Sequence, residues 1–596
     1  MSSTQLAKRW WHNAVVYQIY PRSFNDSNGD GIGDIPGIIE KLDYISELGA
    51  NVIWLSPVYD SPMDDNGYDI SDYMAIAPEF GSMQDMDDLI AQAKQRNIKI
   101  VMDLVANHTS DEHPWFIESK SSKNNPKREW YIWKDPKADG SEPNNWESFF
   151  TPKAWTLDEN TGQYYCHLFS KKQPDLNWAN PEVRNAIYDM MHFWLKKGLG
   201  GFRMDVINMI GKPSDYPDAT IFDSGVAGWE HWSNNLLVHQ YLREMHQKVL
   251  SHYDVLTVGE TPFTTTLDGR YYSHPDRHEV SMIFHFEHMG IDREEHNAVR
   301  KPFDLIEFKS IMSKWQDDLY QKGWNSLYWS NHDQPRAVSR YGDPSEEYRV
   351  ISAKMLATVL HMMSGTPYIY QGEELGMTNK YFADIDEYDD LMAKFHYQKM
   401  IDKGVSKQDA LDFLNHFSRD HARVPVQWDN EKNAGFTTGT PWLAINPNYT
   451  YINAKQAISD KDSIYAHYQK LIALRKGSEF GDVVVYGKHE LLDKDDASVY
   501  AYLRYYDGKT LLILANFTAE TQKRRYDFSL KKILLNNYNL FTDSHLATVG
   551  ELETNADQVS KHVLINDNPE NRSSALNTSL QDIMLQPYQA YIFNVE

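Results

Sequence analysis

The chain has 596 residues, of which 41% are hydrophobic and 24% charged, a composition typical of a folded protein with a large core and room for more than one domain. Its formal net charge of −25 disfavours nucleic acid and anionic membranes as partners, because both require a basic surface. Cys166 is the single cysteine, which excludes a disulfide within the chain, and the first residues show no signal-peptide pattern, so we expect a cytoplasmic protein.

Strand and helix patterns alternate from residue 15 onward. An apolar run at 15–20 predicts a first strand. Apolar residues then recur every three positions over 39–48 and stop at Gly49, which predicts a helix with a glycine at its C-terminus. Ser82 and Asp85 predict the start of a second helix through a capping box. The next two strands are expected at 52–55 and 99–104. This alternation predicts parallel pairing.

The pattern is interrupted after the third strand. Residues 105–180 are rich in Asn, Lys, Pro, Ser and Trp, which predicts an inserted domain. Further strands are expected at 201–205, 255–260, 281–286, 325–329 and 367–371, and they bring the total to eight, the number in a TIM barrel. The polar segment 379–418 is long for a barrel loop, so we expect it to serve function.

The last part of the chain loses the helical period near residue 510. Leu511–Leu514 and Ala590–Phe593 predict strands of a separate domain. We therefore expect an α/β fold in three parts. The parts are a (β/α)8 catalytic barrel of residues 1–104 and 181–505, an inserted domain of residues 105–180, and a C-terminal antiparallel β-sandwich domain of residues 506–596.

Three carboxylates stand at the ends of predicted strands. They are Asp205, Glu260 and Asp333, and each follows its own β-branched or aromatic run. In a parallel barrel the C-terminal strand ends converge on one face, which holds the active site. Cleavage of a glycosidic bond needs two such acids, one to attack and one to protonate the leaving oxygen. The sequence therefore predicts an enzyme that cleaves glycosides.

The neighbours of these acids predict different protonation states. Arg203 lies two residues before Asp205, on the same side of the strand, so we expect it to hold Asp205 ionised. Glu260 lies near Val258 and Phe263, and a less polar surrounding favours the protonated form that an acid catalyst needs.

The segment from Asp26 to Asp34 predicts a metal site. Oxygen-bearing side chains occupy alternate positions and a glycine stands at the sixth, as in the first part of a calcium loop. Gly37 replaces the glutamate of the twelfth position, so we expect a single structural Ca²⁺ or Mg²⁺; the alternative is a metal-free turn rich in Asp and Asn. The expected ligands are the side chains of Asp26, Asn28, Asp30 and Asp34 and the carbonyl of Ile32.

Several of these segments resemble signature regions of the α-amylase superfamily, glycoside hydrolase family thirteen. The matching segments are 103–108, 201–206, 258–260 and 331–333, with an additional signature at 173–177 in the inserted domain. The resemblance implies that Asp205 is the nucleophile, Glu260 the general acid/base and Asp333 the transition-state stabiliser. It implies that the glucose ring is bound by Asp69, His108, Phe169, Gln173, Arg203, His332 and Arg419. It implies no organic cofactor.

Within the superfamily the chain is similar to the oligo-1,6-glucosidases, including the dextran glucosidases. In that group a valine after the nucleophile, here Val206, accompanies cleavage of α-1,6 bonds. The resemblance implies a retaining, exo-acting α-glucosidase that hydrolyses α-1,6 bonds of isomalto-oligosaccharides from the non-reducing end. Residues 261–263 and 423–428 depart from the usual pattern of the group.

Three other functions compete with this one. Sucrose isomerases, which transfer glucosyl groups within sucrose, carry an Arg-rich loop before the fourth region, whereas Lys309–Asn325 has no arginine. A phosphotrehalose hydrolase shares the valine but needs cationic groups in its pocket. A non-catalytic barrel protein would lose catalytic acids, and this chain keeps all three. We expect a small oligosaccharide as the partner, and a monomer or weak homo-oligomer.

Overall fold

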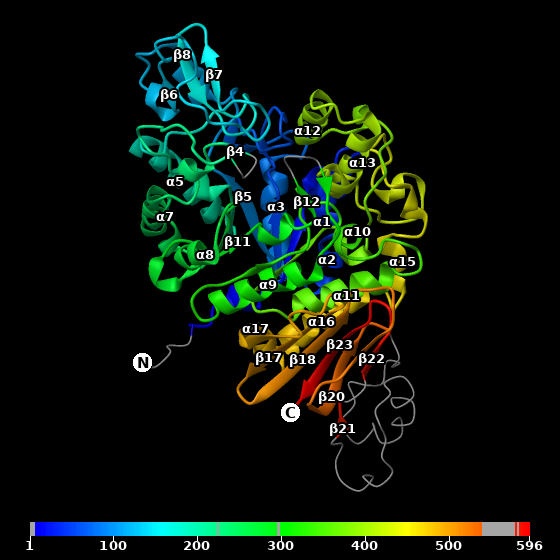
Figure 1. Ribbon diagram of the computed structural model, residues 1–596. Coiled ribbons are helices and arrows are strands. Elements are labelled where there is room, and N and C mark those ends of the chain that lie inside the picture. The colour runs from blue at the N-terminus through cyan, green and yellow to red at the C-terminus, as the bar shows by residue number, and fades with distance from the viewer. Residues whose placement is uncertain (1–5, 223–225, 295–298, 539–577, 581–582) are drawn as a thin grey trace, which may run out of the picture.

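Eight parallel strands form a closed central barrel in the computed structural model, which describes residues 6–222, 226–294, 299–538, 578–580 and 583–596 (Figure 1). The strands are β1 (Val16–Ile19), β2 (Val52–Leu55), β5 (Lys99–Val105), β9 (Gly201–Asp205), β10 (Leu256–Glu260), β11 (Met282–Phe284), β14 (Ser326–Leu327) and β15 (Thr366–Tyr370). Their order is β11-β10-β9-β5-β2-β1-β15-β14, and a parallel bridge between Ile283 and Asn325 closes the ring. The TIM barrel predicted from the sequence is confirmed.

Helices surround this barrel. The main ones are α1 (Ile35–Glu40), α2 (Leu42–Leu48), α3 (Met83–Gln95), α5 (Pro181–Lys197), α7 (Leu236–Lys248), α8 (Thr266–Ser273), α9 (Leu305–Leu319), α10 (Ala337–Tyr341), α11 (Arg349–His361), α16 (Ile464–Gly477) and α17 (Gly481–Tyr486). The helix expected over 39–48 is divided at Lys41, whose φ of −104° and ψ of 6° leave the helical region. Gly49 ends it with a φ of 99°, and the capping box of Ser82 and Asp85 is present.

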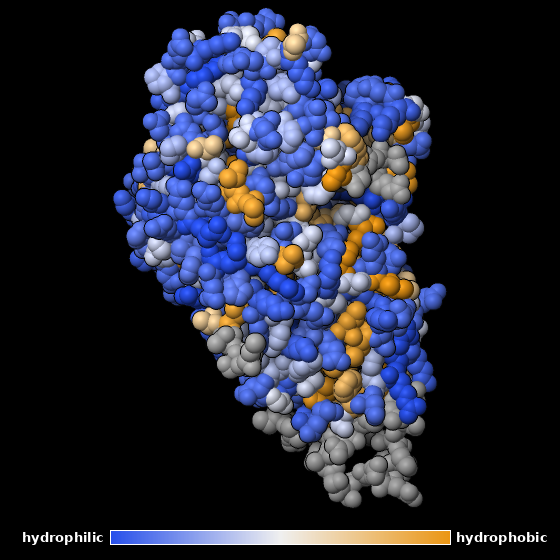
Figure 2. All heavy atoms as spheres, turned by 60° about the vertical axis from the view of Figure 1, so that its left-hand side comes forward, coloured by the Kyte–Doolittle hydropathy of each residue, from blue (hydrophilic) through white to orange (hydrophobic). Residues whose placement is uncertain are grey.

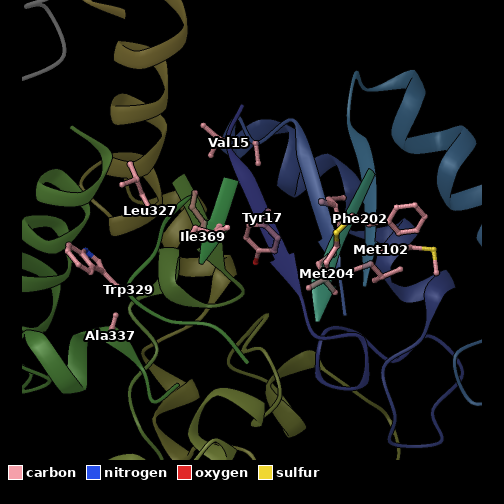
Figure 3. Close-up of a cluster of buried hydrophobic side chains, with 14 of the residues drawn as sticks. Val15, Tyr17, Met102, Phe202, Met204, Leu327, Trp329, Ala337 and Ile369 are labelled. Atoms are coloured by element: carbon pink, nitrogen blue, oxygen red, sulfur yellow. The ribbon is translucent and has the colours of Figure 1, made fainter. Parts of the chain in front are cut away.

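Side chains of the barrel strands alternate between two buried environments. Val16, Trp54 and Val258 belong to the cluster inside the barrel. The intervening residues, such as Phe202 and Met204, belong to the layer between the strands and the surrounding helices (Figure 3). Burial of one such side chain contributes about 1.5–3 kcal/mol to folding. Because Phe202 and Met204 face the helices, the residues that alternate with them on β9 face the barrel interior.

Two segments extend beyond the C-terminal ends of the barrel strands. The inserted segment contains α4 (Pro114–Ser121) and an antiparallel sheet of β6 (Trp133–Lys134), β8 (Gln163–Cys166) and β7 (Trp155–Asp158). The segment after β15 contains α12 (Leu391–Asp402), α13 (Lys407–Phe417), α14 (Asp420–Arg423) and α15 (Ala454–Ser459). Figure 1 shows β6–β8 and the α12–α13 pair at the same end of the barrel, on opposite sides of it.

The C-terminal sheet lies at the other end of the molecule (Figure 1). Its order is β16 (Lys488–Leu492), β17 (Val499–Tyr506), β18 (Lys509–Asn516), β23 (Ala590–Val595), β20 (Ser529–Asn536) and β21 (Thr578–Ser579), and β19 (Gln522–Arg524) pairs with β22 (Ile583–Leu585). The expected strands at Leu511–Leu514 and Ala590–Phe593 pair with each other.

The predicted domain boundary at residue 506 falls within the hairpin of β17 and β18. The first six residues of β17 are all buried, so the strand lacks the polar alternation that marks a strand in a sequence. We propose to place the boundary before Lys488, where the sheet begins, and to keep the inserted domain at 105–180.

The surface in Figure 2 is mostly hydrophilic, with small, separate hydrophobic patches. Among the helices of the described ranges, none has the length and apolar composition needed to cross a membrane.

Gly201, at the start of β9, lies against the neighbouring strand. Its φ is 143°, and a Cβ at this position would lie 1.7 Å from the carbonyl oxygen of Leu256. We expect Gly201→Ala to lower the free energy of unfolding by at least about 2 kcal/mol, because the obstacle is backbone that cannot rotate away. Urea unfolding monitored by circular dichroism measures this change.

The matched control is Gly477→Ala, at the end of α16, where a Cβ would meet no atom within 4 Å. We expect this variant to be unchanged or up to about 1 kcal/mol more stable. Equal stability of the two variants would contradict the close approach at Gly201.

Candidate active site

One guanidinium group joins three carboxylates at the ends of neighbouring barrel strands. Arg203 Nη1 lies 2.7 Å from Asp103 Oδ1 and 2.6 Å from Asp205 Oδ1, and its Nη2 lies 2.6 Å from Glu260 Oε2. The register of β5 against β9 places Asp103 directly beside Arg203. All four side chains are buried. The pairing of neighbouring strands and the alternation of side chains along each strand therefore bring these four groups together.

The single positive charge of Arg203 cannot neutralise three acids. Burial raises the pKa of Asp205 well above its usual range, and Glu260 and Asp103 raise it further, while Arg203 lowers it only in part. Arg203 is thus shared among three acids, and the expectation that it holds Asp205 ionised stays a prediction.

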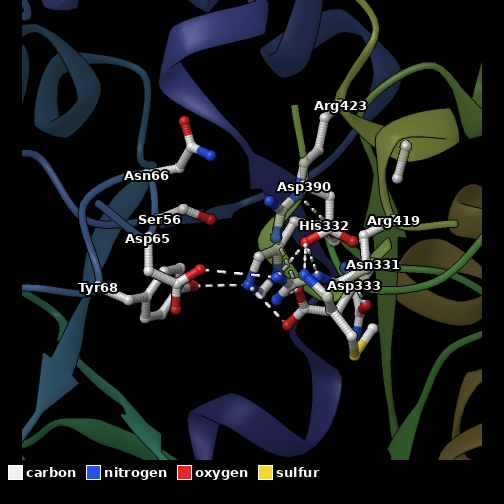
Figure 4. A network of polar contacts seen from close by, with 12 residues as sticks. Ser56, Asp65, Asn66, Tyr68, Asn331, His332, Asp333, Asp390, Arg419 and Arg423 are labelled. Carbon is white, nitrogen blue, oxygen red and sulfur yellow. Dashed lines mark hydrogen bonds and ion pairs between the residues drawn. The ribbon is translucent and has the colours of Figure 1, made fainter. Parts of the chain in front are cut away.

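Asp333 has the opposite electrostatic environment (Figure 4). Its carboxylate lies 3.1 Å from Arg419 Nη1, 2.9 Å from Arg423 Nη2 and 3.1 Å from His332 Nε2. Burial alone would raise its pKa, but His332 and the two arginines hold the pKa well below the usual range. Asp333 is therefore a fixed negative charge in the site.

Asp390 holds Arg419 in this arrangement. Its Oδ1 contacts the guanidinium of Arg419, and the same carboxylate accepts hydrogen bonds from the backbone N–H groups of Met392 and Ala393 in the first turn of α12. One side chain thus caps a helix and fixes a cation that contacts Asp333.

Tyr68 connects the two groups of charges. Its hydroxyl lies 2.6 Å from His332 Nε2 and donates a hydrogen bond to Asp103 Oδ2 at 3.2 Å. The rings of Tyr68 and His332 stack with centroids 5.3 Å apart, and Gln18 Nε2 lies 2.9 Å from His332 Nδ1. The imidazole orientation is therefore fixed from three directions.

Asp69, predicted to bind the glucose ring, is fully buried. Its carboxylate accepts hydrogen bonds from the backbone N–H groups of Asp64 and Asp65, at 2.9 and 3.0 Å, and from the Ser61 hydroxyl at 3.1 Å. Burial raises the pKa of Asp69 to about 6. In the structure this side chain orders the loop before it, and its contact with substrate stays a prediction.

His108, Phe169 and Gln173 lie close together, and their contact with the glucose ring stays a prediction. His108 Nε2 lies 3.3 Å from Gln173 Nε2, and the rings of His108 and Phe169 are 5.0 Å apart. The Gln173 amide donates a hydrogen bond to Asp65 Oδ2 at 3.1 Å. Burial lowers the pKa of His108 to about 4, so its imidazole is neutral at pH 7.

A cavity of about 1080 Å³ opens above these residues. Of the predicted site residues, Glu260, Asp333, Phe169 and Arg419 line it, whereas Asp69, His108, Gln173, Arg203, Asp205 and His332 are not among its lining residues. One wall comes from residues 147–152 of the inserted segment and the other from α12 and α13. This volume is at the upper end of the range of small-molecule pockets, so it accommodates more than a monosaccharide.

Sequence reasoning missed several residues of the charged network. Tyr68 and Arg423 had local signals, because one precedes Asp69 and the other follows Arg419 by four residues. Asp390 lies in the polar segment 379–418, whose length indicated function without indicating a particular side chain. Gln18 and Asp65 gave no comparable signal.

The predicted metal loop closes on itself. Asp26 accepts hydrogen bonds from the backbone N–H groups of Asn28, Gly29 and Gly31, and Asp34 caps α1 by accepting from Gly37. Asn28 and Asp30 each accept a hydrogen bond from the backbone N–H two residues later. In the part of the chain that the structure describes, no three or more His, Cys, Asp and Glu side chains are grouped to hold a metal ion.

Comparison with known proteins gives a consistent result. A sequence model of the family Alpha-amylase, described as the alpha amylase catalytic domain, matches residues 18–487. The oligo-1,6-glucosidase of Bacillus cereus is 54% identical over 542 residues, which cover 90% of this chain and 96% of that protein. The trehalose-6-phosphate hydrolase of Bacillus subtilis is 52% identical over 85% of this chain and 90% of that protein.

A solved structure extends this similarity to three dimensions. The isomaltulose synthase of Klebsiella sp. LX3 superposes with a TM-score of 0.89 at 40% identity, covering 99% of this chain and all of that one. These similarities extend over nearly the whole chain, so they include the barrel, the inserted segment and the C-terminal sheet.

Glu373 lies behind the Asp333 loop and couples protonation to stability. Ser330 and Tyr468 donate hydrogen bonds to its two oxygens at 2.6 and 2.8 Å. Burial raises the pKa of Glu373 to about 7, whereas an unfolded glutamate titrates near ~4.3. Because the folded pKa is raised, its contribution to stability is fully present below the unfolded pKa and is lost as pH rises through 7.

We expect Glu373→Gln to remove this loss. The free energy of unfolding of the variant minus that of the wild type should therefore rise by about 2 kcal/mol between pH 5 and pH 8. Denaturant unfolding at both values measures the difference. Glu346→Gln, at an exposed glutamate, is the matched control and should show no such trend. A Glu373→Gln difference that is independent of pH would contradict the raised pKa.

Proposed function

Because the chain belongs to the alpha-amylase family and is a glycosidase, we propose that it is a retaining, exo-acting α-glucosidase that hydrolyses α-1,6 bonds of isomalto-oligosaccharides from the non-reducing end. The observation that carries the proposal is the pair of Asp205 and Glu260 on one arginine, with the ionised Asp333 nearby. The α-1,6 preference is supported by the relatives named oligo-1,6-glucosidase and by Val206 after the nucleophile.

In the proposed mechanism Asp205 attacks the anomeric carbon while Glu260 gives its proton to the leaving oxygen. The C–O bond to the second sugar breaks and a covalent glucosyl ester forms on Asp205. Glu260 then takes a proton from water, which attacks the anomeric carbon and releases α-glucose with the original configuration. Retaining enzymes hold these two carboxyl groups roughly 5–5.5 Å apart.

Asp333 and Arg203 supply the electrostatics of this mechanism. The transition state carries positive charge on the ring, and a carboxylate that stays ionised stabilises it without reorganisation. Arg203 contacts both reacting acids, so it holds their relative position while the proton moves between Glu260 and the substrate.

A second candidate function, hydrolysis of a phosphorylated α-glucoside, is favoured by one observation. Arg293, Lys399 in α12 and Lys403 at the C-terminal end of α12 line the cavity and could contact a phosphate. A relative named trehalose-6-phosphate hydrolase is 52% identical to this chain.

The test is a comparison of kcat/KM for isomaltose, panose, maltose, sucrose and trehalose 6-phosphate. We expect isomaltose or panose to exceed maltose by about tenfold or more, because a difference in contact at the second sugar changes discrimination by about 1–3 kcal/mol. NMR should detect α-glucose as the first product. Asp205→Asn, purified identically, should lose nearly all turnover because an amide is not a nucleophile.

A preference for trehalose 6-phosphate would replace the proposal by the second candidate. A preference for maltose would contradict the α-1,6 specificity but not the retaining mechanism, and conversion of sucrose to an isomer would indicate an isomerase.

We also propose that the loop from Asp26 to Asp34 binds a structural Ca²⁺ or Mg²⁺. The support is the alternation of oxygen ligands and the φ of 99° at Gly31, the sixth position, where a calcium loop turns sharply. Asp26, Asn28, Asp30 and Asp34 would contribute side-chain oxygens, and Ile32 its carbonyl. The ion would hold the start of α1, and no catalytic step involves it.

We expect chelation by EDTA to lower the Tm by at least about 2 °C, since an ion that binds the folded state alone adds stability. Activity at 25 °C should change little, and added Ca²⁺ should restore the Tm. Asp30→Ala is the matched variant and should have a Tm that does not respond to EDTA. An unchanged Tm of the wild type would favour the metal-free turn.

The substrate of such an enzyme is a small oligosaccharide, as the sequence predicted. The cytoplasmic location and the monomeric or weakly oligomeric state stay predictions of the sequence.

A further inference from the structure

Phe263 has a backbone conformation that is rare for its residue type. It lies in the loop after β10, three residues beyond Glu260, in the segment 261–263 that departs from the related group. Its φ is 60°, a region in which the Cβ of any residue other than glycine is crowded. Such conformations persist only where the surroundings hold them, and they concentrate at functional sites.

Two buried or half-buried asparagines hold this conformation. Asn208 Nδ2 donates a hydrogen bond to the carbonyl of Pro262 at 2.7 Å, and Asn234 Nδ2 donates to the carbonyl of Phe263 at 2.9 Å. Asn208 also donates to Asn234 Oδ1 at 3.1 Å. The carbonyl groups on both sides of the Phe263 Cα are thus fixed by one connected pair of amides.

The ring of Phe263 belongs to an aromatic wall of the cavity. It stacks on Trp229 with centroids 5.2 Å apart and an interplanar angle of 25°, and it lies 6.4 Å from Phe149 at 26°. Phe149 in turn stacks on Phe169 at 5.1 Å. Phe263, Phe149 and Phe169 all line the cavity that contains Glu260. The strained backbone therefore places a half-buried ring on the same wall as the acid catalyst.

We propose that Phe263 is a specificity-determining residue whose ring binds the leaving sugar, the one whose oxygen Glu260 protonates. This inference rests on the proposed function, in which Glu260 protonates the leaving oxygen, so the leaving sugar begins next to this loop. An aromatic face attracts the C–H groups of a neutral hexose through dispersion and through its negative quadrupole. Its neighbours Val206, Pro262 and Phe149 favour the same ligand, because they are apolar.

Lys399 in α12 and Lys403 at its C-terminal end, which would bind a phosphorylated sugar, lie on the other wall, and Arg293 lies 5.6 Å from the ring of Phe417 in α13. The ligand class that Phe263 selects is therefore a neutral glucosyl or oligoglucosyl leaving group.

The experiment compares Phe263→Gly with wild type on isomaltose and on α-glucosyl fluoride. Both substrates present the same glucosyl group, but fluoride leaves without a second sugar. Glycine accepts a φ of 60° without strain, so the loop conformation is retained and only the ring is lost. We expect the ratio of kcat/KM for isomaltose to that for glucosyl fluoride to fall about tenfold, chiefly through a higher KM for isomaltose. Phe263→Tyr keeps the aromatic face and should restore the ratio to within threefold.

His278→Gly is the matched control. His278 also has a positive φ of 55°, but it is exposed and is not among the cavity-lining residues. Its substitution should leave both kcat/KM values unchanged.

Two outcomes would overturn the inference. The first is an equal loss of kcat/KM on both substrates in Phe263→Gly, which would indicate a structural role. The second is an unchanged kcat/KM for isomaltose in that variant. A wild-type protein inactive on both substrates would instead contradict the proposed function, so the two failures are distinguishable.

Discussion

The arrangement of the site depends on one guanidinium that is shared among three buried acids. Arg203 contacts Asp103, Asp205 and Glu260, so three acidic side chains share one positive charge. A buried charge is costly unless it is paired and hydrogen-bonded. The barrel strands hold these four side chains in positions where they pair with one another, which offsets that cost. Asp333 differs from Asp205 in that it has two arginines and a histidine. The two environments shift the pKa values of these two aspartates in opposite directions.

The sequence predicted the parts of the fold that depend on local pattern. Eight apolar runs gave the eight barrel strands, and Ser82 and Gly49 gave helix ends, because capping and left-handed backbone follow from residue type. It failed at β17, where burial on both faces removes the alternation that identifies a strand. The positions of Asp205 and Glu260 at the ends of β9 and β10 were predictable from the sequence. The raised pKa of Asp205 was not, because it depends on burial in the folded chain and on the charges of Glu260 and Asp103, which are distant in sequence.

The same limit explains which site residues were missed. Asp390 and Gln18 contact Arg419 and His332, which lie far along the chain, so no nearby motif indicates this role. Phe263 was visible as an unusual residue after Glu260, but its left-handed backbone and its ring contacts depend on Asn208, Asn234 and Trp229. A side chain whose role depends on tertiary contacts can be recognised only in the structure. A carboxylate at the end of a predicted strand can be recognised in the sequence.

Asp390 has a consequence for how this scaffold can diversify. It begins α12 and at the same time anchors Arg419, so the first turn of this helix is tied to the charge network of Asp333. Beyond that turn, α12 contributes Phe395 and Lys399 to the cavity, and Lys403 follows at its C-terminal end. Mutations along the outer part of the helix can therefore alter which molecules are accepted while the reaction centre stays intact. An insertion or deletion in the segment before α12 would move the start of the helix and the contact between Asp390 and Arg419 together. New activities could therefore evolve here by substitution rather than by insertion.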